Sequence, residues 1–212
     1  MSTKLWAPDP SGIAAAASAI ARGGVIGFPT DTVYGLAAAA GDPAAVAEVS
    51  RIKGRPDSQP LILMACSIDQ VANYAILNPL AVELAQRFWP GPLTLILPSL
   101  PGAPTLGGDG TVGVRVPGHQ VALALLAQSG PLATTSANRH GRPPAAGAAA
   151  ALAELPGLAG ALADHTGAGG GLEPSSILDL SQEVPVLLRA GRLGARELGI
   201  PLIRDGSGSR RD

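Results

Sequence analysis

Residues 28–36 read Phe28-Pro29-Thr30-Asp31-Thr32-Val33-Tyr34-Gly35-Leu36, a proline-led polar turn between short apolar runs. The turn places two hydroxyls and a carboxylate directly after a predicted buried strand at residues 25–28. Buried polar groups that lack partners each cost on the order of several kcal/mol. The turn therefore indicates that a ligand binds beside this strand.

A second polar segment follows within twenty residues and reads Arg51-Ile52-Lys53-Gly54-Arg55-Pro56. We expect Lys53 and Arg55, two positions apart in an extended segment, to project from the same side. Two cations that converge in this way suit a triphosphate, because they neutralise the charge that develops at phosphorus during phosphoryl transfer. The segment therefore predicts a phosphate site.

The composition is that of a globular protein with a large core. Of the 212 residues, 46% are apolar and 15% are charged, which argues against disorder. The net charge of −1 argues against a surface that binds polyanions throughout, although it allows a local basic pocket. The one cysteine, Cys66, excludes an internal disulfide and a cysteine-based zinc cluster. We see no signal peptide and no apolar run near eighteen residues, so we expect a cytoplasmic protein.

Predicted helices and strands alternate along the chain without a repeat, which is typical of an α/β domain with a twisted, mixed sheet. We expect one domain at residues 10–203, after a leader at 1–9 and before a flexible tail at 204–212. Asp42-Pro43 and Asn78-Pro79 are typical helix starts, with a cap followed by proline at the first helical position. The expected helices are 10–22, 42–52, 67–72, 78–88, 119–128 and 145–155, and the expected strands are 25–28, 61–65, 93–97, 111–116, 132–135, 176–180 and 184–188.

Polar residues at two predicted strands are candidates for a binding site. Arg115 lies inside an apolar strand, where it needs an anionic partner, either an Asp or Glu side chain or a ligand carboxylate. Ser136 and Asn138 follow another strand and offer a hydroxyl and an amide. Each of these residues also has an ordinary interpretation, as a salt bridge, a solvated face or a helix cap. The residues alone thus predict an α/β domain with an anion pocket, and no more.

A resemblance to a known family adds to this prediction. The chain closely resembles the YrdC/TsaC family of threonylcarbamoyl-AMP synthases, over about residues 10–195. The resemblance implies a single-domain YrdC-like fold, in which a twisted mixed sheet and flanking helices surround a large, positively lined cavity. It rests on the order of the stretches Phe28–Leu36, Lys53-Gly54-Arg55-Pro56, Trp89-Pro90-Gly91-Pro92-Leu93-Thr94, Val114-Arg115-Val116-Pro117, Thr135-Ser136-Ala137-Asn138, Ser175-Ser176-Ile177 and Leu188-Arg189-Ala190-Gly191.

The implied activity is that of a nucleotidyltransferase. Such an enzyme converts L-threonine, bicarbonate or CO2, and ATP into threonylcarbamoyl-AMP and pyrophosphate. The product feeds the N6-threonylcarbamoyl modification of adenosine 37 in tRNA, which a separate transferase complex completes in bacteria. ATP is then a substrate that brings Mg²⁺ with it, and no prosthetic group or dedicated metal site is expected.

The resemblance also implies roles for individual residues. Lys53 and Arg55 are the expected catalytic residues, because they neutralise charge at the phosphates. The expected ATP-binding residues are Arg55, Gln59, Thr111, Ser136, Asn138, Arg142 and Arg189. The expected L-threonine-binding residues are Thr32, Met64, Arg115, Thr134 and Ser175, with Arg115 opposite the substrate carboxylate.

The chain departs from the family pattern at two positions. Gln59 stands in Ser58-Gln59-Pro60-Leu61, where the family often has Asp-Asn-Pro-Leu, and Met64 stands where many members have a histidine. Two alternatives to the synthase therefore remain open. One is a paralogue with the same fold and a different carbamate or acyl substrate. The other is a module that binds double-stranded RNA or tRNA through the same basic cavity, with salt-sensitive affinity.

Overall fold

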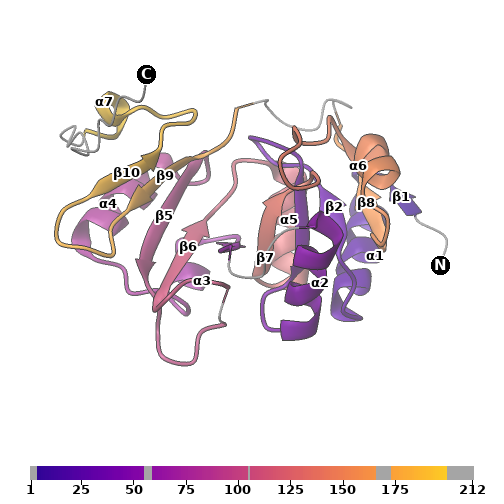
Figure 1. The fold of residues 1–212 in the computed structure, drawn as a ribbon, viewed down its shortest axis with the longest axis horizontal. Helices are drawn as coiled ribbons and strands as arrows, with labels where there is room; N and C mark the ends of the chain where they lie inside the picture. The colour runs from indigo at the N-terminus through magenta and orange to yellow at the C-terminus, as the bar shows by residue number, and fades with distance from the viewer. Residues whose placement is uncertain (1–3, 55–58, 105, 166–172, 200–212) are drawn as a thin grey trace, which may run out of the picture.

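The computed structural model describes residues 4–54, 59–104, 106–165 and 173–199, and Figure 1 shows their fold. The strands form one sheet in the order β1-β8-β2-β3-β7-β4-β6-β5-β9-β10. Parallel and antiparallel pairs alternate irregularly along it, so the predicted mixed α/β sheet is confirmed. The strands are β1 Lys4–Trp6, β2 Ile26–Phe28, β3 Gly35–Ala39, β4 Ile62–Met64, β5 Leu93–Pro98, β6 Thr111–Arg115, β7 Leu132–Ser136, β8 Gly160–Leu162, β9 Ser176–Asp179 and β10 Val186–Arg189.

Most helices begin where the sequence predicts a cap. The side chains of Asp42, Ser67 and Asn78 each accept a hydrogen bond from a backbone N–H in the first turn of the helix that follows. Proline then occupies the first turn of α2 and of α4, where its missing N–H costs nothing. The helices are α1 Pro10–Ala21, α2 Pro43–Lys53, α3 Ile68–Val71, α4 Pro79–Phe88, α5 Gln120–Ser129, α6 Ala148–Glu154 and α7 Ala195–Leu198.

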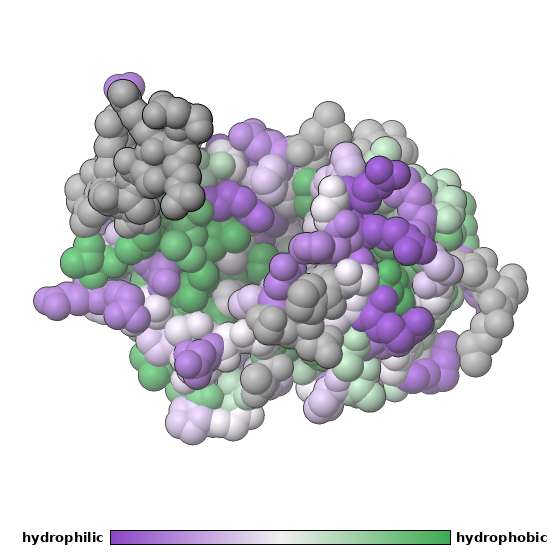
Figure 2. Space-filling model, viewed as in Figure 1, coloured by the Kyte–Doolittle hydropathy of each residue, from purple (hydrophilic) through white to green (hydrophobic). Residues whose placement is uncertain are grey.

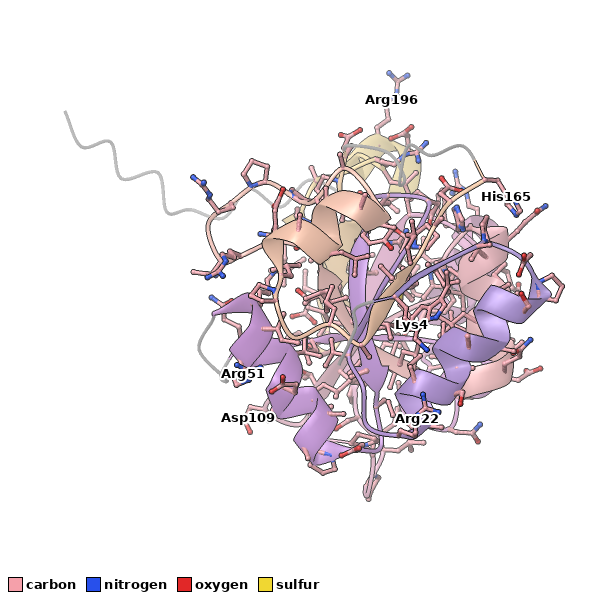
Figure 3. All side chains as sticks on the ribbon, turned by 90° about the vertical axis from the view of Figure 1, so that its right-hand side faces the viewer. Lys4, Arg22, Arg51, Asp109, His165 and Arg196 are labelled. Atoms are coloured by element: carbon pink, nitrogen blue, oxygen red, sulfur yellow. The ribbon has the colours of Figure 1, made fainter. Side chains whose placement is uncertain are left out.

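The sheet separates two hydrophobic clusters. On one face, α1 and α5 pack together over β2 and β7. On the other face, α2 and α6 share a larger cluster with residues of α3 and α4. Figure 3 shows the helix that carries Arg51 and the helix that leads to Arg22 on opposite sides of the sheet. The molecule is therefore a three-layer α/β sandwich.

The opening polar stretch is the turn of an antiparallel β2–β3 hairpin. Its tyrosine ties the hairpin to the neighbouring strand, because the Tyr34 hydroxyl donates to Leu162 O at 2.6 Å. Burial, and then the nearby Asp164 carboxylate, raise the pKa of this phenol, so it stays neutral and donates. The turn that follows β2 is thereby fixed at the centre of the sheet.

Several elements differ from the sequence prediction. Strand β3 was not expected as a strand, and neither were β8 and helix α7. Residues 4–6 fall in the expected leader, yet they form β1 and pair in parallel with β8. Residues 204–212, expected as a flexible tail, lie outside the described residues.

The expectation that Lys53 lies in an extended segment was wrong. Lys53 is the last residue of α2, and Gly54 ends the helix in the left-handed conformation with φ 66°. Glycine adopts this conformation without the steric cost of a Cβ, so the helix ends and the chain turns at Gly54. Arg55, which was paired with Lys53 in the prediction, lies outside the described residues.

Successive side chains of β5 and β6 point to opposite faces of the sheet, and on one of these faces they border a cavity. In β5 and β6, Leu95, Leu97, Val112 and Val114 point into the larger hydrophobic cluster. The residues between them point to the face that carries α1 and α5, in a region that lines a cavity. No helix of the described residues is long and apolar enough to cross a membrane.

Candidate functional site

The cavity has a volume of about 590 Å³ and lies on the sheet beside the β2–β3 turn. It is lined from β2, β3, β4, β5, β6, β7, β9 and β10, so eight of the ten strands of the sheet contribute to one concave surface. Figure 2 shows an apolar surface over β9 and β10 in the left half of the view, and polar side chains over α2 and α6 in the right half. Leu188 of β10 is exposed and also lines the cavity.

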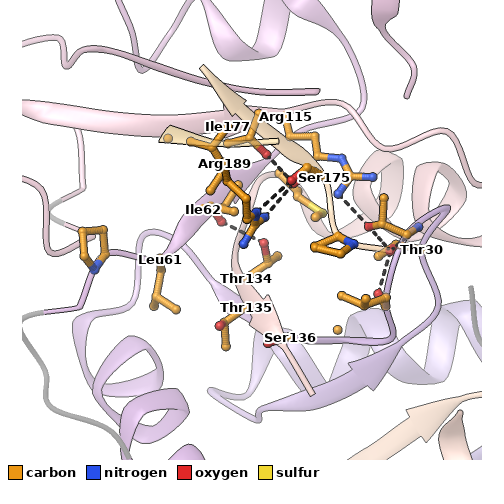
Figure 4. Close-up of a pocket in the computed structure, with 18 of the residues that line it drawn as sticks. Thr30, Leu61, Ile62, Arg115, Thr134, Thr135, Ser136, Ser175, Ile177 and Arg189 are labelled. Atoms are coloured by element: carbon orange, nitrogen blue, oxygen red, sulfur yellow. Dashed lines mark hydrogen bonds between the residues drawn. The ribbon is translucent and has the colours of Figure 1, made fainter. Parts of the chain in front are cut away.

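Two groups of polar side chains mark different parts of this cavity. We call Arg115, Ser175 and Arg189 the arginine cluster, and Lys53, Ser136 and Asn138 the lysine cluster. Figure 4 shows the three members of the arginine cluster gathered at the upper part of the cavity, with Ser136 at the lower part. The two clusters differ in how fully their hydrogen bonds are engaged.

Arg115 is held by three partners and keeps two donors. Its side chain is 2% exposed and forms an ion pair with Asp31 at 2.6 Å. It also donates from Nε to Gly91 O at 2.9 Å and from Nη1 to Thr32 Oγ1 at 2.9 Å. A guanidinium carries five N–H groups. Two N–H groups of Arg115 thus have no acceptor among the described residues, and the side chain lines the cavity.

The charge of Arg115 is only partly balanced within the protein. Burial lowers the pKa of its guanidinium, the Asp31 carboxylate opposes this shift, and the charges of Arg189 and Arg192 add to it. One carboxylate therefore faces three guanidinium groups. An arginine remains protonated in proteins, so the excess positive charge favours an anionic ligand at this position.

The hydroxyls of the polar turn support Arg115 and offer no proton to a ligand. Thr30 donates to Val33 O at 2.7 Å, so Thr32 is the donor in the 3.1 Å hydrogen bond between the two threonine hydroxyls. Thr32 then accepts from Arg115 and retains one acceptor site. Thr32 lines the cavity, where it can accept a hydrogen bond but not donate one.

Ser175 joins Arg189 to the cavity. Arg189 donates from Nε to Ser175 O at 2.9 Å and from Nη2 to Ser175 Oγ at 3.1 Å. Burial lowers the pKa of the Arg189 guanidinium. The resemblance assigned Arg189 to ATP and Ser175 to the amino acid, and the structure brings the two residues into direct contact.

The members of the lysine cluster form hydrogen bonds with one another. Lys53 is buried at the end of α2, and its Nζ donates to Ser136 O at 2.7 Å, to Asn138 Oδ1 at 2.7 Å and to Ser136 Oγ at 3.1 Å. An ammonium has three N–H donors, so these acceptors match its capacity. Lys53 itself is not among the lining residues, whereas Ser136 and Asn138 are.

Asn138 uses both ends of its amide to hold the next loop. Its Oδ1 accepts from Lys53 and, at 2.6 Å, from Ser136 Oγ. Its Nδ2 donates to Arg139 O at 2.9 Å and to Arg142 O at 2.6 Å. The amide is therefore fully engaged, and it positions the exposed Arg142, which lines the cavity.

The remaining predicted residues lie at or near the same cavity. Met64 is buried in the cavity wall, and Thr111 lines it at the start of β6. Thr134 also lines it, with its hydroxyl proton donated to Ile62 O at 2.9 Å. Gln59 is exposed and does not line the cavity, although the adjacent Pro60 and Leu61 do. Arg55 falls in the range 55–58 that the structure does not describe.

Sequence reasoning did not assign a role to Asp31, the ion-pair partner of Arg115. The partners are 84 residues apart, so no local spacing connects them. The signal was nevertheless present, because Arg115 required an anion and Asp31 is the carboxylate of the turn. Arg192 was also missed, and its Nη1 donates to Asp31 O at 2.6 Å.

Comparisons with known proteins agree with this fold. The family model described as "Telomere recombination", which groups Sua5, YciO and YrdC proteins, matches residues 18–191. The threonylcarbamoyl-AMP synthase of Bacillus subtilis is 38% identical over 211 residues, which cover 93% of this chain and 61% of that protein. The threonylcarbamoyl-AMP synthase of Pyrococcus abyssi is 42% identical over 187 residues, 86% of this chain and 55% of that protein. The chain thus spans little more than half the length of these two relatives.

Solved structures of Sua5 and YciO proteins have the same fold as this chain. The P. abyssi Sua5 protein, crystallised with L-threonine, aligns with a TM-score of 0.85 at 38% identity over 92% of this chain and 60% of that one. Escherichia coli YciO aligns with a TM-score of 0.83 at 25% identity over 93% of this chain and all of YciO. Sequence and structure agree, and the chain belongs to the Sua5/YciO/YrdC family.

Proposed function

We propose that the chain is an L-threonylcarbamoyladenylate synthase, a nucleotidyltransferase that uses L-threonine, bicarbonate or CO2, and ATP. The observation that carries the proposal is Arg115, which keeps two N–H groups without an acceptor among the described residues and lines a cavity that Ser136 and Asn138 of the lysine cluster also line. A paired N–H donor suits the carboxylate of an amino acid. The relatives named threonylcarbamoyl-AMP synthases support the same activity for this chain.

The proposed reaction needs positioned charges rather than a covalent nucleophile. The amine of L-threonine combines with CO2 to give a carbamate. A carbamate oxygen then attacks the α-phosphate of ATP, and pyrophosphate leaves. Arg115 would hold the amino-acid carboxylate, while Lys53, Arg142 and Arg189 would neutralise charge at the phosphates. ATP would bring Mg²⁺ with it, and the product would serve tRNA modification through a separate transferase.

Binding of ATP would require the lysine cluster to exchange partners. Lys53 donates to Ser136 and Asn138 in this structure, so a phosphate oxygen would have to replace one of these acceptors. The exchange would keep the ammonium hydrogen-bonded while adding charge neutralisation. In this proposal Ser136 and Asn138 position Lys53 before ATP arrives.

The test is a pyrophosphate-release assay with purified protein, ATP, bicarbonate and a panel of amino acids. We expect pyrophosphate release that requires L-threonine and falls when serine, glycine or valine replaces it. Release with another amino acid would favour the paralogue over the synthase. A protein that releases no amino-acid-dependent pyrophosphate would refute the proposal.

A further inference from the structure

A buried pair of hydroxyls links β5 to the segment before β9 inside the cavity. Thr94 in β5 is 1% exposed and Ser175 is 3% exposed, and both line the cavity. Their hydroxyl oxygens lie 3.0 Å apart. Arg189 Nη2 also donates to the Ser175 hydroxyl at 3.1 Å. Guanidinium and hydroxyls therefore form a short hydrogen-bonded chain.

A count of the hydroxyl protons shows that this series of hydrogen bonds leaves one O–H donor without an acceptor among the described residues. Two hydroxyls carry two protons, and the hydrogen bond between Thr94 and Ser175 uses one of them. The other proton has no acceptor in the described parts of the chain. Arg189 can only donate, so it does not accept this proton. A buried donor without an acceptor is costly, which favours a ligand acceptor in the cavity.

Either hydroxyl could donate in the hydrogen bond between Thr94 and Ser175, and the contact with Arg189 favours the order that leaves the open proton on Thr94. Arg189 donates to Ser175, and a hydroxyl that accepts from a cation becomes a stronger donor to its next partner. The favoured order is therefore Arg189 to Ser175 to Thr94, with the proton of Thr94 left for the ligand. The Thr94 methyl lies on the side of Gly113, because a Cβ built at Gly113 would be 3.7 Å from Thr94 Cγ2.

Thr94 also lies next to Arg115. Strands β5 and β6 pair Leu95 with Val114 in an antiparallel register, and the next residues along the two strands are Thr94 and Arg115. Both side chains line the cavity. The open hydroxyl proton and the two open guanidinium N–H groups thus lie on adjacent strands at one wall.

We propose that Thr94 is a further substrate-binding residue, whose hydroxyl donates to the carboxylate that Arg115 holds. This proposal rests on the proposed function, because it takes the ligand at this wall to be an α-amino acid. The proposal adds one hydrogen-bond donor, Thr94, to the arginine cluster. It also gives Arg189 a second role, because Arg189 polarises the series of hydrogen bonds that ends at Thr94. Ser175 then transmits this effect as well as lining the cavity.

The competing interpretation is that the hydroxyl pair only joins two strands. Backbone hydrogen bonds already join β5 to β9, in a parallel register that includes Thr94 and Ile177. A purely structural pair would therefore contribute to stability and affect both substrates equally. A substrate-binding pair affects the amino acid alone. The two interpretations predict different kinetic patterns.

The test compares Thr94→Val with Thr94→Ser in the full chain. Valine keeps the shape and removes the hydroxyl, whereas serine keeps the hydroxyl. Loss of one hydrogen bond to a charged group predicts that the KM for L-threonine rises about tenfold or more in Thr94→Val. The KM for ATP should stay within about twofold of the wild type, and Thr94→Ser should have a KM for L-threonine close to the wild-type value.

Isothermal titration with L-threonine alone separates this inference from the proposed function. If the wild type binds L-threonine without releasing pyrophosphate, the proposed activity fails, and weaker binding by Thr94→Val still supports the role of Thr94. Equal affinity of wild type and Thr94→Val overturns that role, whatever the activity. An equal rise in both KM values with a lower Tm also overturns it, since that is the structural pattern. A wild type that neither binds L-threonine nor releases pyrophosphate overturns both.

Discussion

Arg115 and Asp31 form a buried ion pair at the centre of the site, with side chains 2% and 12% exposed. Removing one partner of a buried pair leaves an uncompensated charge, which costs far more than a surface pair contributes. Asp31→Asn keeps the shape and removes the charge. We expect it to lower the free energy of unfolding by about 3 kcal/mol, as measured by urea denaturation.

The matched control is the exposed pair of Arg51 and Glu48 in α2, with side chains 67% and 33% exposed. Glu48→Gln removes the same charge from a solvated pair, so we expect no measurable change in stability. If Asp31→Asn unfolds at the same urea concentration as Glu48→Gln, the ion pair does not carry the charge balance inferred for Arg115.

Lys53→Met tests the lysine cluster at the residue scale. Methionine has a similar length and no donors, so Ser136 O and Asn138 Oδ1 lose a charged partner. Ser136 O still accepts from Asn138 N, and Asn138 Oδ1 still accepts from Ser136 Oγ, so we expect a loss of stability of about 1–3 kcal/mol from the lost hydrogen bonds to the ammonium. We also expect pyrophosphate release to fall at least a hundredfold, the order reached when one transition-state donor is removed.

Arg51→Met, two residues earlier in the same helix, is the control for Lys53→Met. Arg51 is exposed, and its side chain bonds Glu48. Its replacement should change neither activity nor stability measurably. A Lys53→Met protein that keeps the wild-type rate would remove Lys53 from the proposed phosphate site.

At the scale of single elements, the end of α2 depends on Gly54. Gly54 has φ 66°, and a Cβ added there would meet no atom of the described residues within 4 Å. Only the backbone conformation therefore penalises a side chain. Gly54→Ala should cost about 1–2 kcal/mol, the usual cost of the left-handed conformation for an L-residue. Denaturation by urea measures this difference.

Gly41, before α2, provides a matched comparison. It also has open space around a built Cβ, and its φ is not positive. Gly41→Ala should therefore be neutral or stabilising by about 0.4–1 kcal/mol. Equal effects of the two substitutions would show that the left-handed cap does not fix the end of α2.

Capping residues explain which elements the sequence could predict. Asp42-Pro43, Ser67 and Asn78-Pro79 satisfy backbone donors locally, so they predict helix starts without knowledge of the rest of the fold. Strands β3 and β8 have no local signal of this kind, because they consist of glycine, alanine and leucine without polar alternation. These segments become strands because their backbones pair with strands that lie far away in the sequence.

At the scale of the whole molecule, the site could be predicted in part. The need of Arg115 for an anion follows from its place in an apolar strand, and the cavity walls follow from strand alternation. The identity of its partner depends on how distant strands meet. The same holds for Lys53, whose acceptors lie 83 and 85 residues away, and for the link between Ser175 and Thr94 over 81 residues.

The arginine cluster and the lysine cluster differ in whether they have hydrogen-bond donors left for a ligand. This difference predicts the order in which L-threonine and ATP bind. The arginine cluster has open donors, whereas the hydrogen bonds of the lysine cluster are engaged. L-threonine should therefore bind and raise the Tm without ATP. A ligand at 100 times its Kd stabilises the folded state by about 2.7 kcal/mol.

Gly113→Val is the control for that measurement. Gly113 lies in β6 on the cavity floor, and a Cβ there would sit 3.7 Å from both Ile62 Cγ1 and Thr94 Cγ2, in ordinary contact. Valine suits a strand, so the variant should fold while its side chain occupies ligand space. We expect it to lose the threonine-dependent rise in Tm. A rise equal to that of the wild type would place the amino acid elsewhere.

The most direct test of the central claim is to identify the product. Wild-type protein is incubated with ATP, L-threonine and ¹³C-bicarbonate, and the mixture is analysed by mass spectrometry. We predict an adenylate that contains AMP, threonine and one labelled carbamoyl carbon, formed in equal amount with pyrophosphate. ATP turnover without this labelled adenylate, or no threonine-dependent turnover, would contradict the assignment of both clusters to one synthase site.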